Sequence, residues 1–342
     1  MKNIKISLLV VLLILVAAGS AFADGGNRNG TAGATQLLIP VGARGIALGG
    51  ATITSATGLD ALYWNPAGLA RSAKATNITF SQMNYIADIG VAYGAVSTNI
   101  DGFGAVALSI KSLSMDGILK TTVENPDGTG QTFKPEMITI GLTYAKALSD
   151  RIAVGLTANY ISETLDLVKA SGIGFNVGIS YQNLGSIDGL SFAIVIKNLG
   201  PQMQYDGTGL LVSAAPSEYL RNSQLYKVTS QPFDLPSALE LGLGYNYKID
   251  VENQLNFSGV FNNANYYGDE YKAGVEYSYN KSFFVRGGYL YTADVDKNQV
   301  FGFSAGAGID YEADGYDVKV DYAFRNAKFF SGNHVFAVSL GF

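Results

Sequence analysis

The chain has 342 residues, of which only 15% are charged and 12% are aromatic, with 41 glycines, no cysteine and a net charge of −5. Soluble domains carry about 25% charged residues, so this composition argues against the two soluble domains that the length would allow. The absence of cysteine excludes disulfides, thiolate metal sites and a lipidated cysteine. The mild net charge offers no basic surface for nucleic acid.

The N-terminus has the pattern of a secretory signal peptide. Two lysines precede an uncharged apolar run from Ile6 to Ala18, and the small residues that follow end in Ala21-Phe22-Ala23. This apolar run is short for a membrane-spanning helix, which needs about 20 residues, so a signal peptide is favoured over a membrane anchor. We expect residues 1–23 to be removed and the mature, exported chain to start at Asp24. No later apolar run approaches the length of a membrane helix.

Residues 24–74 lack the alternation of a strand and are rich in glycine, alanine and threonine. Their centre is the glycine-dense stretch Val41–Ala51. Asn65 is a good N-cap and Pro66 suits the first helical position, so a short helix is predicted to start in the Asn65-Pro66-Ala67 motif. Two interpretations are open: a turn before the first strand, or an N-terminal hatch. If the rest of the chain is a barrel, some fifty residues that include Trp64 would pack inside it as a plug.

From residue 75 to residue 342 apolar and polar residues alternate in segment after segment. The alternation indicates about fourteen antiparallel strands of about ten residues, the length that a tilted strand needs to cross a bilayer. Strands of a β-sandwich are nearer five or six residues. The predicted fold is therefore an all-β transmembrane outer-membrane β-barrel. The predicted strands are 76–86, 89–99, 103–113, 136–147, 151–163, 172–183, 190–199, 236–249, 253–263, 270–280, 282–292, 300–311, 316–326 and 332–342.

The connections between these strands alternate in length. Short turns alternate with longer loops at 112–135, 164–171, 199–235 and 293–299. Outer-membrane barrels place short turns in the periplasm and long loops outside, and an even strand count then predicts both termini in the periplasm. Tyrosines of the outward parity, such as Tyr144 and Tyr289, fall near both ends of the strands and predict two aromatic girdles.

The last segment, Gly332–Phe342, alternates strictly and ends on an aromatic residue. One parity is large and apolar, which predicts a lipid-facing wall, while Ser339 and Gly341 face inward. The segment resembles the C-terminal signal by which the barrel assembly machinery recognises outer-membrane barrels. The residues that would form this signal are Phe336, Val338, Leu340 and Phe342.

The chemistry of the chain does not predict an enzyme. The only histidine, His334, shares the outward parity of Phe336, which nearly excludes serine–histidine catalysis and histidine-based metal sites. We expect no catalytic residue, no metal and no cofactor. Glu240 and Glu276 could act together as an acid and a base, but charges of both signs inside a barrel normally pair with each other or with a plug. The inward ionisable residues are Lys111, Lys197, Glu240, Lys272, Glu276, Arg286, Asp310, Lys319, Asp321 and Arg325.

Several motifs resemble one family of barrels. The glycine-rich Val41–Ala51, followed by the Asn65-Pro66-Ala67 motif, resembles the N-terminal hatch of FadL-superfamily outer-membrane proteins. Residues Phe80–Asp88 and Ile196–Gly200 are similar to the PorV/PorQ family within that superfamily. The resemblance implies an architecture in three parts: signal peptide 1–23, hatch 24–74 and barrel 75–342.

The resemblance implies two functions. PorV-like proteins serve type IX secretion, where they engage the C-terminal signal domains of cargo and pass it to other components of the system. FadL-like proteins take up long-chain fatty acids or other hydrophobic compounds. We expect secretion, because residues 85–88 and 197–200 are PorV/PorQ-like, and uptake of hydrophobic compounds is the alternative. A barrel with neither activity is the third possibility. For a secretion component, the loops Ser112–Pro135 and Leu199–Leu235 are the expected cargo contacts.

Overall fold

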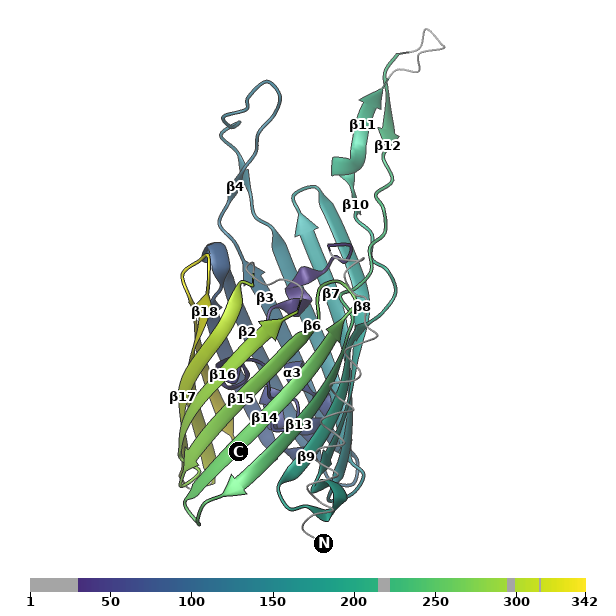
Figure 1. Cartoon of the computed structure of the whole chain (residues 1–342). Helices are drawn as coiled ribbons and strands as arrows, with labels where there is room; N and C mark the ends of the chain where they lie inside the picture. The colour runs from purple at the N-terminus through teal and green to yellow at the C-terminus, as the bar shows by residue number, and fades with distance from the viewer. Residues whose placement is uncertain (1–29, 215–221, 294–298, 314) are drawn as a thin grey trace.

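The computed structural model describes residues 30–214, 222–293, 299–313 and 315–342, and within them the chain forms a closed barrel of antiparallel strands (Figure 1). Fourteen strands of the described chain make up the wall, close to the fourteen predicted segments. They are β1 (Thr76–Asn84), β2 (Gly90–Ile100), β3 (Gly104–Ser114), β6 (Glu136–Ala147), β7 (Ile152–Leu165), β8 (Val168–Gln182), β9 (Leu190–Leu199), β13 (Ala238–Lys248), β14 (Asn253–Ala264), β15 (Glu270–Tyr279), β16 (Phe283–Thr292), β17 (Phe301–Ala313), β18 (Tyr316–Ala327) and β19 (Asn333–Gly341).

The ring closes where the first and last strands of the wall pair. β1 and β19 are antiparallel from Asn77 opposite Gly341 to Asn84 opposite His334, and β9 pairs with both β8 and β13. Closure removes the free strand edges that would otherwise invite aggregation. No helix among the described residues is long and apolar enough to span a membrane.

The two faces of the wall follow the predicted parity. In β19, Phe336 and Val338 are exposed on the outside, whereas Val335 and Ala337 are buried inside. Tyr144, Tyr245 and Tyr247 are exposed near one end of the barrel, and Tyr160, Tyr289 and Tyr291 near the other. An apolar outer wall bounded by aromatic residues is the surface that a bilayer requires.

Short turns gather at one end of the barrel, here called the turn end, and long connections at the other, the loop end. The prediction of a long loop at 164–171 is wrong. β7 and β8 continue to Leu165 and Val168, with Thr164 paired to Lys169, and a two-residue turn joins them. Polar residues at this hairpin resemble a loop in sequence, but their backbone groups still complete the ladder between the strands.

Two connections form hairpins that stand beyond the rim at the loop end (Figure 1). The connection between β3 and β6 contains β4 (Ile118–Leu119) and β5 (Thr132–Phe133). The connection between β9 and β13 contains β10, η7 and the paired strands β11 and β12. The bounds of these four elements are β10 (Asp206–Gly207), η7 (Thr208–Leu210), β11 (Leu211–Ala214) and β12 (Gln224–Lys227). We call the two hairpins the first ribbon (β4–β5) and the second ribbon (β11–β12).

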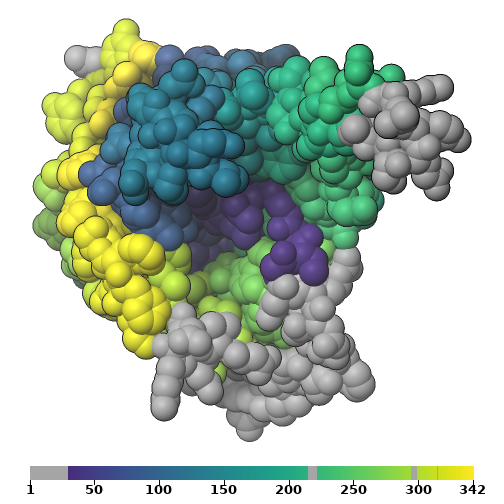
Figure 2. All heavy atoms as spheres, turned by 90° about the horizontal axis from the view of Figure 1, so that it is seen from above, coloured from purple at the N-terminus to yellow at the C-terminus, as the bar shows by residue number. Residues whose placement is uncertain are grey.

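The N-terminal segment lies inside the barrel as a plug, visible in purple in Figures 1 and 2. Ile46, Ile53 and Leu69 of the plug are almost fully buried, in one core with Val195 and Val335 of the wall. Two further short helices, η5 (Ile86–Asp88) and η6 (Leu184–Ser186), lie in connections between strands. The helical elements of the plug are η2 (Thr35–Leu38), α2 (Ala43–Ala47), η3 (Gly58–Asp60), α3 (Ala61–Trp64) and η4 (Pro66–Arg71).

The plug crosses the lumen from the loop end to the turn end. At its start, the Gly33 N–H donates to the Asp234 carbonyl of the long β9–β13 connection (3.1 Å). At its end, the Arg71 guanidinium donates to the carbonyls of Asp150 and Arg151 in the β6–β7 turn. Phe342 lies at the turn end, as predicted, and the N-terminus lies outside the described residues. The described plug begins at the loop end, so the chain crosses the lumen once before β1, which strand counting does not predict. The predicted signal peptide and its cleavage site lie outside the described residues.

Candidate functional site

The Asn65-Pro66-Ala67 motif fixes the plug near the β7–β8 wall. Asn65 is fully buried; its Nδ2 donates to the Ile53 carbonyl (2.8 Å) and its Oδ1 accepts the Ala67 N–H (3.1 Å). Asn65 therefore caps η4 and Pro66 occupies its first turn, as the sequence predicts. The same side chain joins two turns of the plug, which explains why an amide, with both a donor and an acceptor, stands here.

Glycines in the wall make room for the plug on both sides. A Cβ on Gly178 of β8 would lie 2.1 Å from Asn65 Oδ1. Across the lumen, a Cβ on Gly288 of β16 would lie 2.1 Å from the carbonyl carbon of Leu48, and one on Gly49 would lie 2.8 Å from a wall nitrogen, that of Tyr289. Gly49 also has a positive φ of 63°. The plug backbone thus packs directly on the wall backbone, which side chains at these positions would prevent.

The turn-end half of the lumen holds a network of opposite charges that joins the plug to the wall. Arg44 of α2 donates to Glu276 of β15 through Nε and Nη2, each at 2.9 Å from a carboxylate oxygen. Arg286 of β16 donates to the same carboxylate (2.6 Å) and pairs with Asp321 of β18. Glu276 is therefore balanced by two guanidinium groups, one from the plug and one from the wall.

Asp60 of the plug lies close to this network. The Asp60 side chain makes no hydrogen bond or ion pair within the described chain. It lines a cavity that is also lined by Arg44, Arg286 and Asp321. Burial, together with the negative charge of Asp321, raises the pKa of Asp60 above its usual range.

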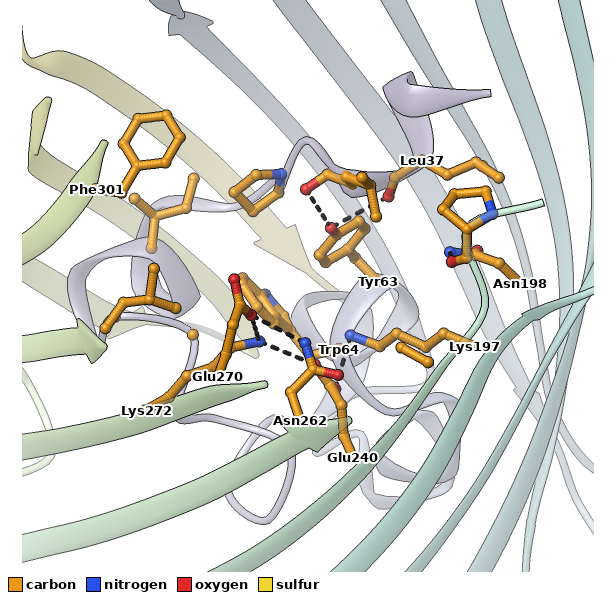
Figure 3. A pocket seen from close by; sticks show the side chains of 18 of the residues that line it. Leu37, Tyr63, Trp64, Lys197, Asn198, Glu240, Asn262, Glu270, Lys272 and Phe301 are labelled. Atoms are coloured by element: carbon orange, nitrogen blue, oxygen red, sulfur yellow. Dashed lines mark hydrogen bonds and ion pairs between the residues drawn. The ribbon is translucent and has the colours of Figure 1, made fainter. Parts of the chain in front are cut away.

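The loop-end half of the lumen holds a second charge network (Figure 3). Glu240 of β13 pairs with Lys197 of β9 (2.9 Å) and with Lys272 of β15 (3.1 Å), and Lys272 also pairs with Glu270 (3.1 Å). Glu240 and Glu276 therefore belong to separate networks, each held between two cations, rather than forming an acid–base pair. Across the described ranges, no group of three or more His, Asp or Glu side chains could hold a metal ion.

A cavity of about 290 Å³ lies above the plug, between these charges and several aromatic rings. Figure 2, viewed from the loop end, shows a hollow beside the plug. Lys197 Nζ lies 4.9 Å from the centre of the Tyr63 ring and 5.3 Å from that of Trp64, and Arg325 stacks at 3.7 Å on Phe301. The lining is thus polar and aromatic, with charged groups from several strands.

A β-bulge interrupts the wall between β8 and β9, where the Ile196–Gly200 motif lies. The pairing shifts between Phe175 and Val177, and Asn198 takes a left-handed backbone with φ 56°. The Asn198 N–H donates to Asn176 Oδ1 (2.7 Å) and its Nδ2 donates to the Pro236 carbonyl (2.9 Å). The amide side chains satisfy the backbone groups that the bulge frees, so the wall stays closed there.

A small apolar core connects the plug to the base of the second ribbon. Ala34 and Leu37 of the plug are buried with Met203 and Leu235 of the β9–β13 connection and Ile161 of β7. Beyond this core the ribbons expose apolar side chains: Leu225 is 70% exposed and Val123, at the tip of the first ribbon, is 95% exposed. The mouth therefore presents apolar surface above the level of the wall.

The structure places the other predicted residues as follows. His334 lies on the outer wall, where its Nδ1 and the Tyr322 hydroxyl are hydrogen-bonded at 2.8 Å. Phe336, Val338, Leu340 and Phe342 are all exposed on that wall, and the Phe342 N–H donates to the Thr76 carbonyl (2.8 Å). The inward parity of the ionisable residues is confirmed, with Lys111, Lys197, Glu240, Lys272, Glu276, Arg286 and Asp321 buried.

Sequence reasoning missed Arg44, Asp60 and Asn176. Arg44 had a usable signal, because it is the one charge within Val41–Ala51. A single charge in a segment that lies inside a barrel needs a partner of opposite charge on the wall. Asn176 carried no such signal, since its role depends on the bulge opposite it.

The fold is similar to that of solved hydrocarbon channels. The structure of "CymD monoaromatic hydrocarbon channel" matches with a TM-score of 0.57 at 14% identity, over 89% of this chain and 97% of that one. The Pseudomonas putida toluene transporter TodX matches with a TM-score of 0.53 at 12% identity, over 86% and 96%. A FadL homologue of Pseudomonas aeruginosa matches at 0.50 and 14%, over 88% and 98%. At such identities the likeness establishes a FadL-like barrel and no more.

Comparison with families is more specific. No curated protein matches the chain. The family model described as "Type IX secretion system protein PorV" matches residues 22–220, more than half of the chain, including the plug and the bulge. The family places the barrel in the bacterial outer membrane. The chain belongs to the PorV family of type IX secretion system proteins.

Proposed function

We propose that this barrel docks cargo of the type IX secretion system at the cell surface, using its two ribbons. The ribbons stand beyond the rim of the wall at the loop end (Figure 1) and carry exposed apolar side chains, including Val123, Leu211 and Leu225. Exposed apolar surface on a segment that lies outside lipid is typical of a protein-binding site. On this proposal the C-terminal signal domain of the cargo contacts the ribbons, and other secretion components receive it.

The single observation that carries this proposal is the state of the lumen. The plug crosses it, the strands of the wall are paired all round, and the large loop-end cavity beside the plug is lined in part by the ion pairs of Glu240 and Lys272. A site for an apolar ligand needs a largely apolar lining, because the gain is about 25 cal/mol per Å² of apolar surface removed from water. The aromatic and aliphatic part of the lining offers some of that gain, but an apolar ligand in the same space would take water away from the charges of Glu240 and Lys272, which opposes its binding.

The second candidate is a channel for fatty acids or other hydrophobic compounds. It is favoured by the FadL-like architecture, since the similar structures include hydrocarbon channels with the same overall barrel. Tyr63, Trp64 and Phe301 supply some apolar lining to the cavity. A channel of this kind would require the plug to move, and Arg44–Glu276 and the packing at Gly288 oppose that movement.

Two assembly steps belong to the same proposal. The signal peptide would be cleaved after Ala23 on export, and the barrel assembly machinery would read the terminal strand through Phe336, Val338, Leu340 and Phe342. The Asn65-Pro66-Ala67 motif would act as the fixed point of the hatch. The exposed apolar outer wall supports contact with outer-membrane lipid.

The test is a crosslinked pulldown of the tagged full chain from outer membranes. We expect recovery of proteins that share C-terminal signal domains. A variant in which residues 209–229 are replaced by a short glycine–serine linker should lose them, while the matched surface variant Asn326→Ala should retain them. Co-purified fatty acid with no protein partner would contradict the docking proposal and favour the channel.

A further inference from the structure

Five cavities lie around the plug, between it and the wall, and neighbouring cavities share lining residues. The large loop-end cavity and a cavity of about 40 Å³ share Leu37, Tyr63 and Asn198. The second cavity shares Tyr63 and Tyr93 with a third, of about 10 Å³. The third meets two cavities of the turn-end half, of about 90 and 190 Å³, at Asp60. The series therefore runs past the whole depth of the plug.

The volumes of the cavities limit which molecules could pass along the series. A cavity needs about 10–15 Å³ of probe-occupied volume to hold one water molecule. The narrowest cavity, between Tyr93 and Asp60, has about 10 Å³ and so fits a single water at most. The cavity of about 40 Å³ above it fits about three. A hydrated ion or an organic solute is larger than this constriction.

Polar groups without partners line the same route. Tyr93 and Thr139 are more than nine-tenths buried; Thr139 Oγ1 has no hydrogen-bond partner in the described part of the chain, and the Tyr93 hydroxyl has only the Ser109 side chain beside it. Lys111 Nζ donates to two plug carbonyls, of Gln36 and Ile39, and lies 5.1 Å from the centre of the Tyr63 ring, so one of its three protons has no oxygen acceptor. Burying such groups unpaired is costly, so they indicate ordered water in these cavities.

We propose that these cavities form a single-file water path through the plugged barrel, which conducts water and protons and excludes hydrated ions and larger solutes. It runs from the loop-end cavity past Tyr63, through the constriction between Tyr93 and Asp60, to the cavities of the turn-end half. Tyr93 of β2 lies at the narrowest point, where its ring restricts the passage and its hydroxyl bonds to the passing water. This path is independent of cargo docking.

The experiment uses the purified full chain in phosphatidylcholine vesicles. Water flux is measured by light scattering after an osmotic step, and proton flux by an enclosed pH-sensitive dye after a pH step.

Tyr93→Phe keeps the ring and removes the hydroxyl. Loss of one hydrogen bond of about 1.4 kcal/mol should lower both fluxes about tenfold. Tyr93→Ala widens the constriction and should add a potassium current in planar bilayers. Tyr289→Phe, on the outer wall, is the matched control.

Each result bears on the path. Fluxes above those of protein-free vesicles that fall in Tyr93→Phe and not in Tyr289→Phe support it. Wild-type protein that is folded, as judged by its heat-dependent gel mobility, and yet no faster than empty vesicles would overturn it. Fluxes that are equal in wild type, Tyr93→Phe and Tyr93→Ala would overturn it as well, because the leak would then lie elsewhere.

Discussion

Arg44 and Glu276 are 232 residues apart in the chain, and two hydrogen bonds of 2.9 Å join them. This pair is the ion pair by which α2 of the plug holds to β15 of the wall. It lies in the turn-end half of the lumen, where Arg286 of the wall donates to the same Glu276 carboxylate. Plug and wall are therefore joined by this ion pair, by hydrogen bonds from Arg71 and Lys111, and by close backbone packing at other positions.

Arg44→Ala should destabilise the folded barrel by about 3 kcal/mol, the lower end of the range for a broken buried pair, because Arg286 still balances Glu276. Urea unfolding followed by the fluorescence of Trp64, the only tryptophan, measures the change. Lys120→Ala breaks the more exposed Lys120–Asp166 pair and serves as the control, with an expected cost of about 0–1 kcal/mol. Equal costs for the two variants would show that Arg44 does not fix the plug.

Gly288→Ala should displace the plug, because the new Cβ would lie 2.1 Å from the carbonyl carbon of Leu48. We expect a cost of about 2 kcal/mol, typical of overpacking, and a red shift of the Trp64 emission. Gly287→Ala is the matched control, since a Cβ at Gly287 meets nothing within 4 Å. A Gly288→Ala protein with wild-type stability and an unchanged emission spectrum would disprove the close packing.

Asn65→Ala should cost about 2 kcal/mol, because it removes both the cap of η4 and the bond to the Ile53 carbonyl. Asn65→Asp keeps the acceptor but turns a buried carboxylate oxygen toward the Ile53 carbonyl in place of the donor, so at pH 7 it should cost at least as much as Asn65→Ala. The same unfolding assay applies, with Asn326→Ala as an exposed control. If Asn65→Ala and Asn326→Ala unfold at the same urea concentration, the motif does not anchor the hatch.

Asp60→Asn should stabilise the protein near pH 7.5 and leave its stability near pH 4 unchanged. The raised pKa of Asp60 means that the folded state favours the protonated form. Its contribution is then fully present below the unfolded pKa of about 4 and is lost as pH rises through the folded pKa. Unfolding curves across pH 4–8 measure the difference. A gain independent of pH would contradict this account.

Removal of Phe342 should lower the fraction of protein that inserts as a heat-resistant barrel. The truncated chain lacks the hydrogen bond from the Phe342 N–H to the Thr76 carbonyl. It also lacks the edge contact between the rings of Phe342 and Tyr316, whose centres are 5.6 Å apart. Gel mobility with and without heating measures the folded fraction. Phe329→Ala, in an exposed connection at the loop end, is the control. Normal insertion of the truncated chain would mean that the terminal strand is not an assembly signal.

The features that sequence could predict are local. The alternation of apolar and polar residues in β19 and β13 can be read from neighbouring residues. It is regular because one face of each strand contacts lipid and the other faces the lumen. The strands and their two faces could therefore be predicted from the sequence. The start of η4 was equally local, because Asn65 and Pro66 are adjacent. The β7–β8 hairpin was missed because polar residues such as Thr164 and Lys169 pair in a ladder outside the lipid.

The features that sequence could not predict depend on contacts across the lumen. Nothing near Arg44 identifies Glu276 as its partner, and nothing near Asn198 identifies Asn176. The direction of the plug was also hidden, since it depends on Gly33 meeting Asp234 in a distant connection. These contacts decide the composition of the cavity, and hence the choice between docking and solute transport.

The most direct test of cargo docking is photo-crosslinking from a single ribbon position in living cells. A photoreactive amino acid replaces Leu225, which is 70% exposed on the second ribbon, and in a parallel strain it replaces Val285, which is 62% exposed on the lipid-facing wall. We predict covalent adducts with secreted proteins that carry the C-terminal signal domain from position 225 and none from position 285. No cargo adduct from position 225, in a strain that still secretes its cargo, would contradict docking by this ribbon.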